Sequence, residues 1–190
     1  RTAMIRTLYT VDEQVGRLVD YLVAHGEMAN TLFVFTSDNG TQWAEHGLQS
    51  KFVPYPDSIG IPLVMRWDGK IAAGATDDRR VAQLDLTATV LAAAGVPSSA
   101  LLVPLDGHDL RTTYRRSVGL AEYWQDDNNN KVIPNWASIT TDTFQYTEYY
   151  EPEAPNTVSY REYYDLVADP HQLTNLFGDA STANDPAIAP

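Results

Sequence analysis

A short apolar run that stops at two oxygen-bearing side chains constrains the fold of this chain more than any other feature. Residues Thr31–Thr36 are rich in strand-forming residues, as expected for a β-strand covered on both faces. Ser37 ends the run, and Asp38, Asn39 and Gly40 follow directly. Open α/β sheets bind ligands at the carboxyl ends of their strands. We therefore expect Asp38 and Asn39 at a ligand-binding edge.

The segments around this run predict an α/β arrangement. Apolar residues recur every three or four positions from Met4 to Leu22, which predicts an amphipathic helix with Gly26 as its C-terminal cap. Ile61–Trp67 predicts a second strand, and Asp85 is expected as the N-cap of a helix that runs through Ala94. Helix, strand, loop, strand and helix in this order are typical of an α/β sheet with crossover helices.

The character of the chain changes after about Leu110, and eight of the eleven tyrosines lie beyond it. Four short segments rich in aromatic or β-branched residues predict a small antiparallel sheet: Val118–Tyr123, Ala137–Thr141, Phe144–Tyr150 and Glu162–Val167. We expect turns at Asp126–Asn130 and 151–156, a short helix near His171–Phe177 and a frayed tail. The predicted parts are therefore an α/β portion at 1–110, a sheet subdomain at 111–178 and a tail at 179–190. The aromatic residues could stack sugar rings, but cross-strand pairs in this sheet explain them more economically.

Composition excludes several classes of function. The chain has 190 residues, a net charge of −12 and no cysteine. Nucleic-acid binding needs a basic surface, so we expect no nucleic-acid partner. Disulfides and thiolate metal sites are excluded, and no run approaches the roughly 18 apolar residues that span a membrane. The helical pattern is already running at the first residue, without an initiator Met, which predicts that the sequence begins inside a larger protein.

Asp38 and Asn39 are candidate metal ligands. A carboxylate and an amide oxygen suit Ca²⁺ or Mg²⁺, both of which prefer oxygen ligands. Two ligands satisfy neither cation, so further carboxylates must come from elsewhere. The alternative is that Asp38, Asn39 and Gly40 form a turn that closes a hairpin.

Lys51 and His46 are candidates for contacting an anionic substrate. Lys51 carries a point charge that could meet an anion, and His46 could donate a proton to a leaving oxygen near neutral pH. The plainer alternative is that Lys51 is a solvated surface residue and that His46 and Glu45 only form hydrogen bonds within a loop. His108 lies in an Asp-Gly-His-Asp stretch that is better explained as a turn. Neither Ser37 nor Thr41 lies in a serine-hydrolase elbow.

The motifs together resemble the sulfatase family of the alkaline-phosphatase-like superfamily. The segment SDNG…AEHGLQSK…PDSIGIPLVMR is similar to the family's Asp-Asn-Gly strand end, its Gly-Glu-His-Gly-Leu, its Lys and its Ser-x-x-x-Pro-Leu. VAQLDLTATVLAAAGV, LDGHDL and the closing EYYDLVADPHQLTNLF continue the resemblance. It extends from about Thr7 to Phe177 and comes nearest to the N-acetylglucosamine-6-sulfatase-like branch.

The resemblance implies roles for individual residues. Asp38 and Asn39 match the ligands of a divalent metal, usually Ca²⁺, and Lys51 matches the lysine that contacts the sulfate and the leaving oxygen. His46 is expected to line the substrate pocket. The substrate would be a sulfated small molecule or glycan. Sulfatases of this type are often secreted, periplasmic or lysosomal, whereas the sequence itself leaves the compartment unknown.

The chain departs from the family pattern in two places. Ala44 stands where the family has Gly, which is expected to restrict the backbone of the loop. The Cys/Ser-x-Pro-x-Arg motif that yields the formylglycine nucleophile is absent, as are the earlier acidic metal ligands. The resemblance therefore implies the C-terminal part of an alkaline-phosphatase-like sandwich, with a mixed sheet flanked by helices, and a fragment that is inactive alone. A phosphodiesterase or phosphonate hydrolase of the same superfamily, or a non-catalytic binding relic of the fold, is the alternative.

Overall fold

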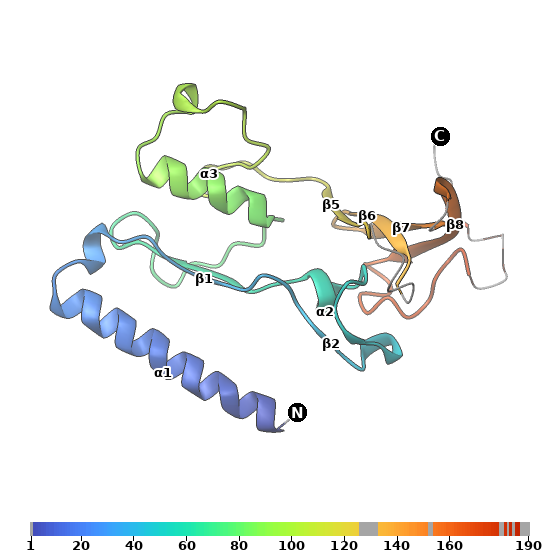
Figure 1. Ribbon diagram of the computed structural model, residues 1–190, viewed down its shortest axis with the longest axis horizontal. Helices are drawn as coiled ribbons and strands as arrows, with labels where there is room; N and C mark the ends of the chain where they lie inside the picture. Colours follow the sequence, from blue (N-terminus) through green and yellow to red (C-terminus); the bar gives the residue numbers. More distant parts are fainter. Residues whose placement is uncertain are drawn as a thin grey trace. The chain divides into compact units, whose positions relative to one another are not determined.

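The computed structural model describes residues 2–125, 133–151, 154–178, 181, 183, 185 and 186. The predicted turn at Asp126–Asn130 and most of the predicted tail lie outside these residues. The helices and strands (Figure 1) are α1 (Thr2–Ala24), η1 (Met28–Asn30), β1 (Phe33–Thr36), β2 (Gln42–Trp43), η2 (Glu45–Gly47), β3 (Gln49–Ser50), α2 (Pro56–Ile59), β4 (Leu63–Arg66), α3 (Gln83–Ala93), η3 (Ser98–Ala100), β5 (Gly119–Tyr123), β6 (Asn135–Thr140), β7 (Phe144–Glu151) and β8 (Ala154–Asp165).

The chain divides into two compact units. One comprises Arg1–Thr36 with Leu63–Asp77, and the other comprises Ser37–Pro62 with Asp78–Pro190. The domain boundaries predicted at 110 and 178 stay predictions.

Helix α1 of the first unit confirms the predicted amphipathic helix, and its end has a clear local cause. Gly26 has a φ of +71°, and Glu27 N donates to the Leu22 carbonyl at 2.9 Å, which is the closing bond of a glycine C-cap. Several apolar residues of α1 are nevertheless exposed to solvent, among them Leu8 at 62% and Leu18 at 50%. No helix in the described part of the chain is long and apolar enough to cross a membrane.

Strands β1 and β4 of the first unit pair antiparallel, with Phe33 opposite Arg66 and Thr36 opposite Leu63. The expectation that the apolar run at Thr31–Thr36 is covered on both faces is wrong for the described residues. Phe35 and Val64 lie opposite each other and remain exposed, so within the described part of the chain no element fully covers this face.

Helix α3 begins earlier than predicted. Ala82, rather than Asp85, is the N-cap, and Asp85 lies in the first turn, where its carboxylate accepts from Ala82 N at 2.8 Å. The same carboxylate also accepts from His108 N and from the Arg116 guanidinium, both from a later segment. Burial alone would raise the pKa of Asp85, but these hydrogen bonds and the Arg116 charge hold it below its ordinary value. Asp85 therefore serves both as a local capping residue and as a partner for the later segment.

The predicted antiparallel sheet is confirmed in the second unit. Strands β5, β6, β7 and β8 lie in that order, and every neighbouring pair is antiparallel (Figure 1). One face buries the aromatic side chains of Trp136 and Tyr164. The same face buries polar side chains that bond to one another, since Thr147 donates to Ser138 at 2.9 Å. Cross-strand pairs such as Tyr149 with Tyr160 confirm the structural interpretation of the tyrosines.

The predicted helix near His171–Phe177 is wrong, because this segment forms turns. Its backbone and side chains bond along β8 instead. Leu176 N donates to the Tyr163 carbonyl at 3.0 Å, and the Asn175 side chain accepts from Tyr163 N at 2.9 Å. Hydrogen bonds to a neighbouring strand thus replace those of a local helix.

Candidate functional site

The Asp-Asn-Gly stretch does not close a hairpin. Strand β1 ends at Thr36 and pairs with β4, whereas the next strand, β2, pairs with β3. Gly40 is instead packed against α2, because its N–H donates to the Ser58 carbonyl at 2.9 Å. A Cβ at Gly40 would clash with the Asp57 carbonyl oxygen, so only glycine fits there. The hairpin alternative is therefore wrong.

The backbone around Asp38 is held by α3. Gln83, the first residue of that helix, donates its side-chain amide to the Ser37 carbonyl at 3.0 Å and to the Asp38 carbonyl at 2.9 Å. Ser37 Oγ donates to the Asn39 carbonyl at 3.0 Å. These bonds fix the backbone around Asp38 without involving its carboxylate. Sequence reasoning missed Gln83, because a polar residue at a helix start carries no sign of a partner 45 residues away.

Lys51 reaches the candidate metal-ligand pair. Its ammonium donates to Asn39 Oδ1 at 2.8 Å, across 12 residues of chain. The Asn39 amide nitrogen in turn donates to the Gly40 carbonyl at 2.7 Å, which sets the direction of the oxygen. Lys51 Nζ also lies 5.3 Å from the centre of the Phe52 ring. Lys51 is therefore a positioned cation and not a freely solvated side chain.

The loop between Asn39 and Lys51 has a strained backbone. Strands β2 and β3 form a two-residue ladder, and the turn between them contains Ala44 at φ +92° and His46 at φ +52°. Ser50 and Phe52 also have positive φ, at +75° and +79°. Each such residue costs about 1–2 kcal/mol when it carries a Cβ. Ala44 therefore occupies a conformation that favours glycine, which agrees with the expected restriction of this loop.

Two side chains of this loop have different surroundings. The His46 imidazole stacks on the Tyr55 ring, with centroids 4.0 Å apart and planes 13° apart. Neither imidazole nitrogen is hydrogen-bonded to any residue within the described ranges. The Glu45 carboxylate accepts from Trp43 N, so it closes the loop. The structure therefore distinguishes Glu45, whose carboxylate is bonded within the loop, from His46, whose imidazole has a ring contact with Tyr55.

Comparison with known proteins identifies the family. The sulfatase family model matches residues 1–96, which is just over half of the chain. The chain belongs to the sulfatase family.

The similarity extends through the C-terminal sheet. The chain is 33% identical to an N-acetylglucosamine-6-O-sulfatase of Bacteroides thetaiotaomicron, over 94% of this chain and 32% of the relative. A solved protein in complex with its substrate D-glucosamine-2-N,6-O-disulfate is 31% identical, with a TM-score of 0.78 over 93% of this chain and 36% of that chain. A phosphonate monoester hydrolase of Agrobacterium radiobacter is 28% identical, with a TM-score of 0.73 over 90% and 35%.

These matches confirm the predicted fold class, an α/β fold of the alkaline-phosphatase-like type. The sulfatase chain spans about a third of the length of the curated relatives it matches.

The donor set of this sulfatase segment suits a hard divalent cation. Asp38 offers a carboxylate, Asn39 offers an amide oxygen, and both are oxygen donors of the kind that Ca²⁺ and Mg²⁺ prefer. Within the described ranges, no three His, Asp or Glu side chains come close enough to hold a metal ion together. The two residues can therefore form part of a metal site, with further ligands still required.

The Asp-Gly-His-Asp stretch is not such a site. His108 stacks on Tyr114 with centroids 3.5 Å apart, and its backbone N–H is bonded to Asp85. Asp109 forms an ion pair with Arg111 at 2.6 Å, and this pairing holds the pKa of Asp109 below its ordinary value. The chain bends at Asp106–Gly107, and the stretch contributes to no cluster of metal-binding side chains among the described residues.

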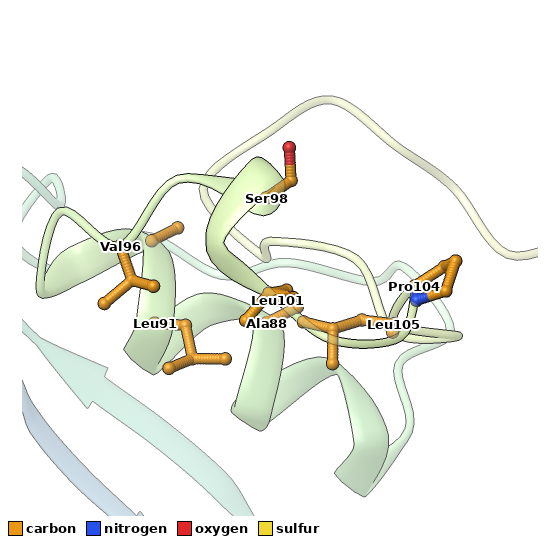
Figure 2. A pocket seen from close by; sticks show the side chains of 9 residues that line it. Ala88, Leu91, Val96, Ser98, Leu101, Pro104 and Leu105 are labelled. Carbon is orange, nitrogen blue, oxygen red and sulfur yellow. The ribbon is translucent and has the colours of Figure 1, made fainter.

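A concavity of about 520 Å³ lies beside α3 (Figure 2). Its lining is mainly aliphatic, with labelled side chains from α3 and from the segment that follows it: Ala88, Leu91, Val96, Ser98, Leu101, Pro104 and Leu105. None of the described residues that line this groove is charged. It therefore lacks the chemistry to bind or hydrolyse an anionic ester, and the candidate site stays at Asp38–Lys51.

Proposed function

We propose that the complete protein is a metal-dependent sulfatase that hydrolyses a sulfate ester on a sugar. The observation that carries this proposal is the 2.8 Å contact between Lys51 Nζ and Asn39 Oδ1, next to Asp38, in a chain of the sulfatase family. These groups supply a cation for the sulfate and two oxygen ligands for a metal. The nucleophile, a formylglycine, and the remaining acidic ligands would come from outside these 190 residues.

Each site residue has a separate task in this proposal. Asp38 and Asn39 would hold Ca²⁺ or Mg²⁺, which as a Lewis acid would stabilise negative charge on the sulfuryl oxygens. Lys51 would donate to a sulfate oxygen and to the leaving oxygen, which stabilises charge that develops during the reaction. His46 would donate a proton to the leaving oxygen of the sugar.

The proposed substrate is a 6-O-sulfated glucosamine. Two proteins similar to this chain are named for that chemistry: the N-acetylglucosamine-6-O-sulfatase and the protein bound to a glucosamine disulfate. The net charge of −12 does not oppose an anionic substrate, because Lys51 and the bound metal set the local field.

A second candidate is hydrolysis of a phosphonate or phosphate diester on the same scaffold. The similarity to a phosphonate monoester hydrolase, at a TM-score of 0.73, favours this alternative. Comparison of nitrophenyl sulfate, phosphate and phenylphosphonate esters with the complete protein distinguishes the two. A kcat/KM that favours the phosphonate would replace the sulfatase proposal.

Calorimetric titration with Ca²⁺ tests the metal site independently of turnover. We expect binding to wild-type protein and at least a roughly tenfold weaker association for Asp38→Ala, because that variant lacks a charged ligand. Unchanged Ca²⁺ binding in Asp38→Ala would remove the metal site from the proposal. A stable complete protein without turnover on any of these esters would instead support a non-catalytic binding protein.

A further inference from the structure

His46 depends on its ring contact for its position. Its backbone has a φ of +52°, and no residue within the described ranges is hydrogen-bonded to either imidazole nitrogen. The contact that remains is the face-to-face stack on Tyr55, at 4.0 Å and 13°. The stack holds the plane of the imidazole and leaves both nitrogens free to bond to a substrate.

Tyr55 is itself held from the C-terminal sheet. It is only 9% exposed, and its hydroxyl donates to Glu162 Oε1 on β8 at 3.0 Å. The second oxygen of Glu162 accepts from the Tyr149 hydroxyl on β7 at 2.9 Å. Because Glu162 is buried and both of its oxygens are bonded, its carboxylate has one preferred orientation. The orientation of the Tyr55 ring follows from it.

The backbone that precedes Tyr55 is tied to the same sheet. Trp136 Nε1 on β6 donates to the Phe52 carbonyl at 2.8 Å, and the Gln145 amide on β7 donates to the Pro54 carbonyl. Together with the Tyr55 hydroxyl on Glu162, these bonds connect the segment to three different strands. Tyr55 rests on a rigid support, and not on a flexible loop.

The tyrosine–histidine stack at the end of α1 provides a contrast. Tyr21 on α1 and His25 just after it have centroids 4.0 Å apart, but Tyr21 is 59% exposed. There the imidazole Nδ1 is bonded to the Tyr21 carbonyl at 2.8 Å, so the histidine is positioned by its own helix. The His46 stack differs in both respects, because its tyrosine is buried and its imidazole nitrogens have no partner among the described residues.

We propose that Tyr55 is a positioning residue for His46, and that Glu162 transmits the orientation of the C-terminal sheet to the reacting group through Tyr55. This inference rests on the proposed function, in which His46 donates to the leaving oxygen. It assigns the sheet a part in the reaction that requires no contact between Glu162 and the substrate.

A double-mutant cycle in the complete protein tests the inference. We expect Tyr55→Leu to lower kcat by roughly 10- to 100-fold with little change in KM, because a misplaced group acts only in the transition state. In a His46→Ala background the same substitution should change kcat by less than about twofold. Tyr21→Leu, which removes the stack on His25, should leave kcat at the wild-type value.

Tyr55→Phe keeps the ring but removes the bond to Glu162, so it provides a variant that folds more readily. We expect a smaller loss of kcat and a change in the His46 ring signals in NMR, because the ring-current shift from Tyr55 depends on their stacking. Equal losses of kcat from Tyr55→Leu in the wild-type and His46→Ala backgrounds would overturn the inference. So would unchanged His46 signals in both Tyr55 variants.

The result separates this inference from the proposed function. Full activity of His46→Ala would show that His46 has no part in the reaction, which removes its role in the proposed function and with it the inference. A large loss in His46→Ala together with wild-type kcat in Tyr55→Leu would leave the proposed function intact and overturn the inference alone.

Discussion

The segment Ser37–Tyr55 and the sheet of β5–β8 belong to the same unit, yet their backbones are built in opposite ways. The segment has strands of only two residues and four non-glycine residues with positive φ. The sheet has continuous antiparallel registers between its neighbouring strands, with irregularity only near Tyr150. No residue with positive φ lies in the described part of its strands.

The difference shows how a strained site is supported. The candidate catalytic groups lie on the irregular segment, where short turns bring Asn39 and Lys51 together. The regular sheet supplies buried donors and an acceptor to the end of that segment, through Trp136, Gln145 and Glu162. Hydrogen bonds to the sheet offset strain in the loop, so we expect loop substitutions to affect mainly activity and sheet substitutions to affect mainly stability.

The largest expected effect is the loss of activity in Lys51→Ala. Removal of a donor to developing negative charge should lower kcat by roughly 10²–10³-fold. The melting temperature should change little, because the contact with Asn39 lies at a partly exposed position. Lys70→Ala, at an exposed lysine after β4, is the matched control and should keep wild-type kcat. A large drop in the melting temperature of Lys51→Ala would contradict the expectation that loop substitutions affect mainly activity and sheet substitutions mainly stability.

The next largest effect is the loss of stability in Glu162→Ala. The substitution leaves the hydroxyls of Tyr55 and Tyr149 without their acceptor in a buried place, which should lower the free energy of unfolding by about 2–5 kcal/mol. Urea unfolding followed by circular dichroism measures this change. The control is Glu122→Ala on β5, where the side chain is exposed and the change should stay within about 0.5 kcal/mol.

Alkaline pH should weaken the hydrogen bond by which Tyr55 connects the segment Ser37–Tyr55 to Glu162 of the sheet. Burial and the nearby Glu162 carboxylate raise the pKa of Tyr55 from 10.0 to about 12, so the folded state favours the protonated hydroxyl. The stability that Tyr55 contributes is fully present below about pH 10 and is lost as the pH rises towards about 12. Between these values the melting temperature of wild-type protein should fall more steeply than that of Tyr55→Phe. If the melting temperatures of the two proteins fell in parallel with pH, the Tyr55 hydroxyl would not contribute to this connection.

The smallest expected effect is a gain of stability in Ala44→Gly. Glycine adopts the positive φ of this position without strain, but it also gains freedom in the unfolded chain, so the net gain should be at most about 1 kcal/mol. Ala92→Gly in α3 should have the opposite sign and cost about 1 kcal/mol, because glycine weakens a helix. Equal losses in both variants would show that the loop at Ala44 is not strained.

Much of the local structure follows from patterns in the sequence. The spacing of apolar residues predicted α1, and the aromatic and β-branched segments predicted the strands of the C-terminal sheet. The predictions that failed concern places where a distant partner decides the local structure. Asp85, expected as an N-cap, lies in the first turn of α3 and also binds Arg116 from a later segment. The segment after His171 bonds along β8 and forms no helix.

The sequence by itself determined which groups are close along the chain: two oxygen-bearing side chains at a strand end, and a histidine and a lysine a few residues later. Only the tertiary structure decided that Lys51 bonds to Asn39. It also decided that the Tyr55 ring stacks on His46 while the Tyr55 hydroxyl bonds to Glu162, 107 residues away. The physical reason is that periodicity and spacing report on contacts within one helix, strand or turn. A hydrogen bond between buried groups on distant segments depends on how the strands and loops pack, which no local pattern records.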